Sequence, residues 1–256
     1  MNSTDTITLL CEDTVDGIFT AIYKAWELGT GHTAVQVEDG TSMSLFSTYR
    51  KVDTDSDIAF RVARSVSRKI SEEAYGMIYN AALSDRPGKA QYIYKFLQKG
   101  FKAGSDIVNY LQDDDVRNVY EMSGFVWRES HKYMGFVRFE ELESGILCSR
   151  INPRSNVIPL LAEHFNDRLN QENWMILDTN RDFAAVHKKG EEALLIKGVT
   201  EEQLSSMGKL SEREKEFQSL WDCFYHTIAI SERKNDRQQM LMMPKRYRKY
   251  MKAENS

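Results

Sequence analysis

The sequence of 256 residues has little cysteine and proline and no long apolar run. Its three cysteines, Cys11, Cys148 and Cys223, are far apart and form no CxxC pair, so neither a disulfide framework nor an iron–sulfur motif is indicated. We expect reduced thiols and a cytoplasmic location. No apolar stretch approaches the roughly 20 residues of a membrane helix, and the N-terminus does not resemble a signal peptide. The four prolines mark no clear linker, so we expect one domain over residues 1–256.

Familiar catalytic motifs are also missing. The sequence contains no GxGxxG, GxxxxGK[ST], HExxH or GxSxG pattern, which removes the usual support for dinucleotide, P-loop, zinc-protease and α/β-hydrolase readings. The HxE and PCxxC pattern of zinc deaminases is absent as well. We therefore predict neither a metal site nor a resident cofactor.

Hydrophobic periodicity predicts an α+β fold with a helical N-terminal half and an antiparallel sheet in the second half. Before residue 134 we expect strands at 7–11 and 34–37, a helix at 15–28, a loop over 38–53, and three or four helices between 56 and 133. The antiparallel sheet has about five strands, at 136–140, 146–151, 174–177, 183–186 and 194–196, with a helix at 157–169. The capping-box sequence Ser211–Glu214 opens a closing amphipathic helix, whose aromatic residues we expect in the core.

Charge is distributed unevenly along the chain. From Ser231 to Lys252 there are eight basic and two acidic residues, so this segment carries +6 while the whole chain carries −4. The possible substructure is thus 1–133 mostly helical, 134–230 sheet with helices, and 231–256 basic. One interpretation is nucleic-acid binding, in which cations neutralise phosphates and tyrosines stack on unpaired bases. The other is a solvated basic tail.

The centre of the chain holds the candidate polar residues, and each has two readings. His131 is predicted to end a helix. One interpretation makes it a phosphate contact or an acid–base group, and the other makes it a C-terminal helix cap. Arg138 is predicted in a strand. One interpretation is a bidentate contact with a phosphate, and the other is an ion pair with Glu140 or Glu163. Glu129 is a candidate carboxylate for a pair with Glu140. Further residues that could converge with Arg138 are His164, Arg168, Asp178 and Arg181.

Lysines form a shared face on one of the predicted helices. Lys95, Lys99 and Lys102 are spaced to lie together on its polar side. We interpret this face as solvated surface, with a track for phosphates as the alternative. Asp113–Asp115 then places negative charge at the N-terminus of the following helix, where the macrodipole favours it.

The sequence resembles a bacterial family of unassigned biochemistry that is linked to DNA metabolism or DNA repair. The resemblance lies in blocks spread over nearly the whole chain: Asp16–Tyr23, Val52–Asp57, Glu129–Leu142, Asn156–Arg168, Trp174–Asp178 with Arg181, Ile230–Asn235 and Met243–Tyr247. The sequence departs from the pattern at Ser231 and Asp236, where proline is usual, at Arg248, where tryptophan is expected, and at Cys11–Asp13, which replaces Tyr-Asp-Gly.

The resemblance implies a context. Members are typically encoded beside a radical S-adenosylmethionine (radical-SAM) protein assigned to DNA modification or repair, and some are fused to a domain like uracil-DNA glycosylase. Our first hypothesis is therefore a DNA-binding accessory protein that acts with a radical-SAM partner. The predicted nucleic-acid contacts are Arg138, Arg168, Arg181, Arg233, Lys234, Lys245, Arg246 and Tyr247.

Two other hypotheses remain open. In one the protein is an enzyme acting on damaged DNA or nucleotides, with His131, Glu129 or Asp178 as acid–base candidates. In the other it binds a protein partner without touching DNA, and the basic segment docks on an acidic surface. Neither the oligomeric state nor the strandedness of any DNA follows from the sequence.

Overall fold

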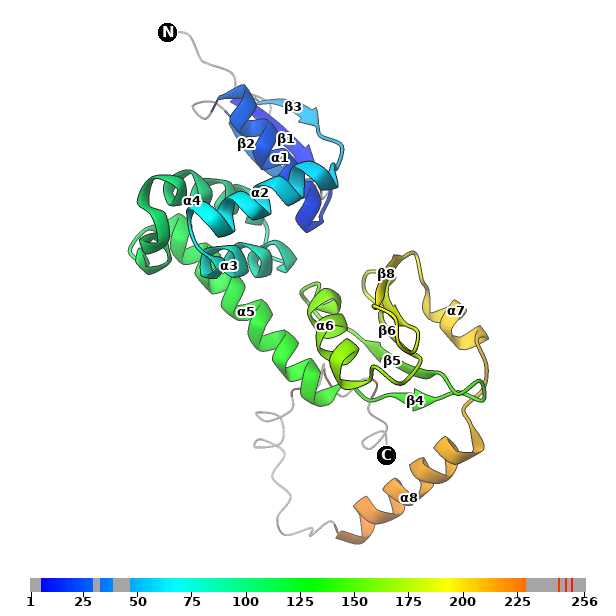
Figure 1. Ribbon diagram of the computed structural model, residues 1–256. Coiled ribbons are helices and arrows are strands. Elements are labelled where there is room, and N and C mark those ends of the chain that lie inside the picture. The colour runs from blue at the N-terminus through cyan, green and yellow to red at the C-terminus, as the bar shows by residue number, and fades with distance from the viewer. Residues whose placement is uncertain are drawn as a thin grey trace. The chain divides into compact units, whose positions relative to one another are not determined.

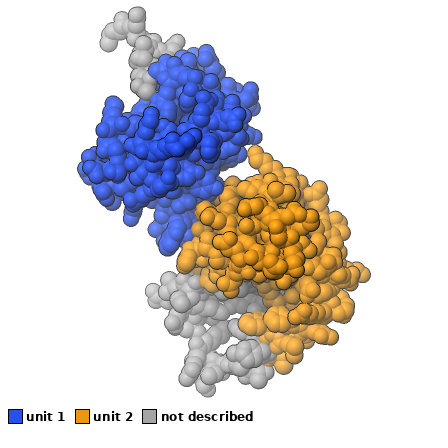
Figure 2. All heavy atoms as spheres, viewed as in Figure 1, with its two compact units in different colours: residues 1–128 blue, residues 129–256 orange. Residues whose placement is uncertain are grey.

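A computed structural model describes residues 6–29, 33–38 and 47–228, together with Pro244, Tyr247 and Tyr250. The chain forms two compact units, residues 1–128 (unit 1) and 129–256 (unit 2), which Figure 2 shows in different colours. The fold is α+β and 55% helical, as the periodicity predicts at that level. The two units are described separately below.

Unit 1 contains a small parallel sheet, so the first half of the chain is helical only in part. Its strands are β1 (Thr6–Cys11), β2 (Thr33–Val37) and β3 (Ser47–Lys51), in the order β2-β1-β3, with β1 parallel to both neighbours (Figure 1). The prediction of a loop over 38–53 is wrong at β3. The sequence Ser-Thr-Tyr-Arg-Lys has no apolar alternation, and this strand is specified by its pairing with β1 rather than by its own pattern.

Helices make up the rest of unit 1, and most begin where a capping residue stands. They are α1 (Val15–Leu28), α2 (Ser56–Lys69), α3 (Glu72–Leu83), α4 (Lys89–Ala103), the short 3₁₀ helix η1 (Gly104–Asn109) and the first part of α5 (Asp114–Phe136), whose last residues belong to unit 2. The side chains of Thr14, Asp55 and Ser71 accept backbone hydrogen bonds at the starts of α1, α2 and α3. One hydrophobic core joins β1, β2 and these helices around Phe19, Ile78 and Phe96.

Asp113–Asp115 lies at the start of α5, as the sequence predicts. Asp113 Oδ1 accepts hydrogen bonds from the amides of Asp115 and Val116, at 3.0 and 3.2 Å. Lys99 Nζ lies 2.6 Å from Asp113 Oδ1 and 2.7 Å from Asp115 Oδ2, and Lys95 Nζ lies 3.7 Å from Asp115 Oδ1. Two of the three lysines on the polar face of α4 are therefore ion-paired.

Helix α5 continues to Phe136, which shortens the first predicted strand of the second half. The strand expected from Phe136 to Glu140 is reduced to β4 (Glu140–Glu141), because the helical hydrogen bonding persists past Gly135. The turn at Gly145, with φ of +79°, leads from β4 into the antiparallel strand β5 (Leu147–Ile151). This is the predicted hairpin with a shorter first arm.

The sheet of unit 2 is mixed rather than purely antiparallel. Its remaining strands are β6 (Trp174–Asp178), β7 (Phe183–His187) and β8 (Leu194–Lys197), in the order β4-β5-β6-β7-β8. The prediction of an antiparallel sheet is wrong at β5 and β6, which are parallel. Helix α6 (Ile158–Arg168) connects them and packs against β6 and β7 (Figure 1), and such a crossover returns the chain in the same direction.

Two helices follow the sheet, and the second corrects a prediction. They are α7 (Glu201–Ser206) and α8 (Glu212–Ile228), and Ser211 Oγ accepts the amide of Glu214 as its capping sequence predicts. Phe217, Leu220 and Trp221 of α8 are 56%, 69% and 42% exposed, so these three residues are not in the core of unit 2. No described helix is long and apolar enough to cross a membrane.

Candidate functional site

A polar network in unit 2 holds the loop that follows β5. Buried Glu129, on α5, accepts hydrogen bonds from the amides of Arg154 and Ser155 at 3.1 and 2.9 Å. From the other side, Arg181 Nη1 donates to the carbonyl of Pro153 at 3.3 Å, and its Nη2 donates to the carbonyl of Arg154. Glu129 and Arg181 thus meet at one loop although they are 52 positions apart in the sequence.

Asp178 supports this network from the end of β6. Its carboxylate is fully buried, pairs with Arg181 Nη1 at 2.9 Å, and accepts the amide of Asn180 at 2.9 Å. Burial raises the pKa of Asp178, and the opposing effect of Arg181 and the Asn180 amide only partly offsets this. Its neighbour Asn180 donates Nδ2 to Asn152 and to the carbonyl of Pro153.

The structure brings two of the three acid–base candidates to this loop and separates the third from Glu129. Glu129 and Asp178 both serve the loop, whereas His131 is an exposed residue on α5, two positions from Glu129 and hence on a different face of the helix. Both carboxylates are engaged in internal hydrogen bonds. Their geometry is that of loop anchors.

A cavity of about 550 Å³ lies beside the sheet of unit 2 and is rich in cations. We call it the Arg138–Arg150 cavity. Among the described residues that line it, Arg138, Arg150, Lys209 and Lys215 are basic and Glu140 is the acid. Burial raises the pKa of its Cys148 thiol to about 11, which favours the protonated, less nucleophilic thiol at neutral pH. The lining therefore favours an anionic ligand over covalent chemistry.

The two arginines of the cavity are oriented by carboxylates. Arg138 Nη2 lies 3.4 Å from Glu214 Oε1, and Arg150 Nη1 lies 3.3 Å from Glu140 Oε2. The carboxylate beside Arg138 is thus that of Glu214, at the start of α8, and not the predicted Glu140 or Glu163. Arg138 itself lies between α5 and β4 rather than in a strand. Sequence reasoning missed Arg150, which lies in β5 between buried Ser149 and Ile151.

Two tyrosines of the basic C-terminal segment contact other parts of unit 2. The ring of Tyr247, only 4% exposed, lies 4.8 Å from the ring of Tyr133 and 5.6 Å from that of Phe136. The hydroxyl of Tyr250 is 3.0 Å from Thr179 Oγ1, and Tyr250 also lines the Arg138–Arg150 cavity. Stacking of Tyr247 on a base stays a prediction, and in this structure its ring is packed against the protein.

A model of one protein family, described as a domain of unknown function (DUF4130), matches residues 87–253. The chain belongs to this family. The matched residues include the loop network, the Arg138–Arg150 cavity and both anchoring tyrosines, so the family match covers the whole candidate site of unit 2. None of the curated proteins searched matches the chain.

The other predicted contacts of the DUF4130 region have different surroundings. Arg168 is exposed in the last turn of α6, where the helix macrodipole favours a cation. Arg181 is committed to Asp178 and the loop carbonyls. Arg233, Lys234, Lys245 and Arg246 lie outside the described residues. Within the described part of the chain, no group of three His, Cys, Asp or Glu residues is placed to hold a metal ion.

Proposed function

We propose that this DUF4130 protein binds DNA through its basic C-terminal segment and the Arg138–Arg150 cavity, as an accessory protein in DNA repair or base modification. The observation that carries the proposal is the anchoring of this segment beside the cavity. Tyr247 and Tyr250 belong to the segment with charge +6, and Tyr250 is part of the cavity lining. A residue of the segment with charge +6 therefore lines the cavity that also contains four basic side chains.

Charge is the physical support for DNA as the ligand. A polyanion gains from neutralisation by Lys and Arg because bound counterions are released. Of the four basic lining residues, Arg138, Arg150 and Lys215 are each paired with a carboxylate, so the main excess of positive charge comes from the C-terminal segment. The repair context and the radical-SAM partner enter the proposal from the resemblance of the sequence alone.

The test is fluorescence anisotropy of the full chain with labelled single- and double-stranded DNA over a salt series. The double variant Lys245→Ala, Arg246→Ala should weaken binding and flatten the slope of log K against log [salt] by about 1.4–1.8, the value for two lost phosphate contacts. Substitution is preferable to deletion of 231–256, because deletion also removes Tyr247 from its packing against Tyr133.

Lys188 and Lys189 provide a matched control. Both are exposed in the turn after β7, so Lys188→Ala, Lys189→Ala removes the same charge from another part of unit 2. This control should leave the salt slope unchanged. An equal loss of DNA affinity in both double variants would show that only net charge matters. An unchanged salt slope in the Lys245, Arg246 variant would show that the segment does not contact DNA.

A further inference from the structure

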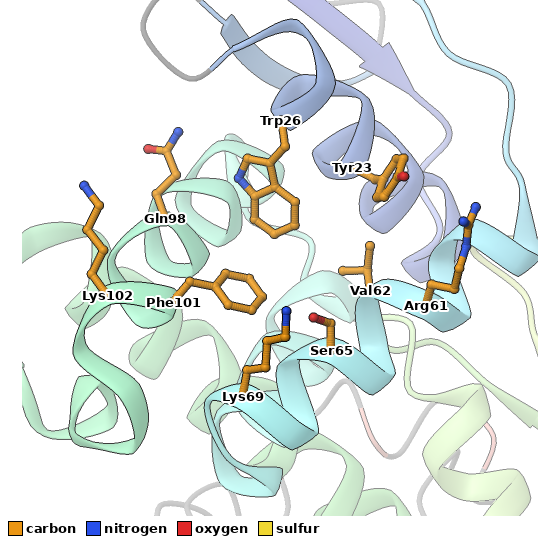
Figure 3. A pocket seen from close by; sticks show the side chains of 9 residues that line it. All are labelled: Tyr23, Trp26, Arg61, Val62, Ser65, Lys69, Gln98, Phe101 and Lys102. Carbon is orange, nitrogen blue, oxygen red and sulfur yellow. The ribbon is translucent and has the colours of Figure 1, made fainter.

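A second cavity lies in unit 1 and has a different lining. It has a volume of about 600 Å³, within the range typical of small-molecule sites, and lies between α1, α2 and α4 (Figure 3). Its described lining residues comprise three aromatics, three cations, two neutral polar residues and a valine: Tyr23, Trp26, Phe101, Arg61, Lys69, Lys102, Ser65, Gln98 and Val62. None of these is acidic. We call it the Trp26–Lys69 cavity.

The aromatic side of this cavity presents ring surface to the opening. Trp26 and Phe101 pack edge to face, with ring centroids 5.2 Å apart, and both are only partly buried although they adjoin the core of unit 1. The guanidinium carbon of Arg61 lies 5.4 Å from the ring centroid of Tyr23. Such half-exposed rings are suited to stacking with an aromatic ligand.

The pairing of the cavity's cations differs from that of the other lysines on α4. In the described ranges of the chain, no acidic side chain pairs with Arg61, Lys69 or Lys102. On the same helix as Lys102, by contrast, Lys95 and Lys99 both pair with Asp115. Because like charges at one cavity repel each other, an anion placed between them is favoured.

Two of the polar groups point into the space that the rings face. In Figure 3 the Lys69 ammonium and the Ser65 hydroxyl, both from α2, are directed toward Trp26 and Phe101. Lys102 stands beside Gln98 at one edge of the cavity, and Arg61 stands near Tyr23 at the other. The helix macrodipole accounts for a cation in the last turn of α2 or of α4, but not for their location at one cavity with an aromatic wall.

We propose that the Trp26–Lys69 cavity binds a nucleotide, with its base against Trp26 and Phe101 and its phosphate at Lys69. A nucleotide combines the two features that the lining matches, an aromatic ring and a phosphate anion. The same chemistry is offered by a free mononucleotide and by one unit of single-stranded DNA. The walls from α1 and α2 precede residue 87, so they lie outside the family match. The proposal does not rest on the role assigned to unit 2.

The test is isothermal titration calorimetry of the full chain with AMP, adenosine and ribose 5-phosphate. AMP should bind, whereas adenosine and ribose 5-phosphate should each bind at least about tenfold more weakly, since each lacks one of the two recognised features. Lys69→Ala should weaken AMP binding by a similar factor. The matched control is Arg68→Ala, which removes an exposed charge next to Lys69 that does not line the cavity.

Competition with a labelled oligo(dT) distinguishes the two sources of the ligand. If AMP displaces the oligonucleotide and Lys69→Ala weakens both, the cavity accepts a unit of single-stranded DNA. If AMP binds without displacing it, the ligand is a free nucleotide. The proposal is overturned if AMP does not bind at millimolar concentration, or if Lys69→Ala has no more effect than Arg68→Ala. Failure of the Lys245, Arg246 variant to change DNA binding would leave this result untouched.

Discussion

Both carboxylate oxygens of Glu129 accept a backbone hydrogen bond, one from the amide of Arg154 and the other from that of Ser155. An acidic side chain two positions before a histidine suggests a catalytic role, yet this one anchors a loop. Asp178 and Arg181 hold the same loop from β6. At the scale of single residues, the structure therefore gives these three groups a stabilising role.

Glu129→Ala tests that role through stability. Removing the carboxylate leaves the buried amide of Ser155 without its acceptor, whereas the amide of exposed Arg154 can turn to water. We therefore expect the free energy of unfolding to fall by about 1–3 kcal/mol, the cost of one unsatisfied buried donor. Glu129→Gln, which keeps one acceptor oxygen, should lie between wild type and Ala. Urea denaturation followed by circular dichroism measures this. Glu163→Ala, on the exposed face of α6, is the control, and an equal loss there would refute the anchor.

The raised pKa of Asp178 predicts a particular pH dependence. Burial makes the folded state hold a proton that the unfolded chain releases near 3.8. The stability contributed by this group therefore falls as pH rises from 3.8 to the folded-state pKa and is constant above it. In urea titrations, wild type should lose stability relative to Asp178→Asn across that window. A gain instead would mean that Arg181 outweighs burial and lowers the pKa.

Two helices of unit 2 that look alike in sequence differ in their packing. Both α6 and α8 carry apolar residues at helical spacing, but Phe165 of α6 is 4% exposed and Phe217 of α8 is 56% exposed. The ring of Phe165 lies 5.1 Å from that of Phe139 and 6.3 Å from that of Trp174. At the scale of elements, amphipathicity predicts that a helix forms and not whether unit 2 covers its apolar face.

A matched pair of substitutions measures this difference. Phe165→Ala should cost about 3–5 kcal/mol of unfolding free energy because it leaves a cavity in a packed core. Phe217→Ala should change the same quantity by no more than about 0.5 kcal/mol. Thermal denaturation of both variants under one condition provides the comparison. A comparable loss at Phe217 would show that α8 is buried in solution.

At the scale of the whole molecule, each unit has a hydrophobic core of its own. The core of unit 1 includes Phe96, and unit 2 buries Ile176 within its sheet. We expect a calorimetric enthalpy of unfolding larger than the van't Hoff value, as for a protein that does not unfold in one cooperative step. Phe96→Ala and Ile176→Ala should each lower mainly one component of the heat-capacity trace. A single transition moved equally by both would show that the units unfold together.

Much of the fold is predictable because it is encoded locally. The caps at Thr14, Asp55 and Ser71, the turn at Gly145 and the proline in the first turn of α6 act within a few residues of the chain. Local signals of this kind place most of the helices and the hairpin β6–β7, whereas β4 is shorter than predicted and α7 has no counterpart in the prediction. They fail at β3 and at the parallel pair β5–β6, whose partners are distant in sequence.

The candidate site is less predictable than the fold for the same reason. Residues such as Glu129, Arg138 and Asp178 are recognisable as polar groups in an apolar context, but their partners lie 26, 76 and 3 positions away. Only the short Asp178–Arg181 spacing falls within one turn of chain. Arg150 drew no attention because a single arginine in a strand has no distinctive pattern. The cavity forms only where Leu204 of α7 and Lys215 of α8 come beside Arg138 and β5.

What the sequence by itself determines is the α+β composition, the positions of most elements and the concentration of positive charge after Ser231, since these depend on the order and spacing of residues. Tertiary structure alone decides that the sheet of unit 2 is mixed, that Glu129 and Asp178 face inward, and that two cation-lined cavities form. Each of those outcomes depends on contacts between segments far apart in the chain, and local sequence patterns do not predict the free energy of such contacts.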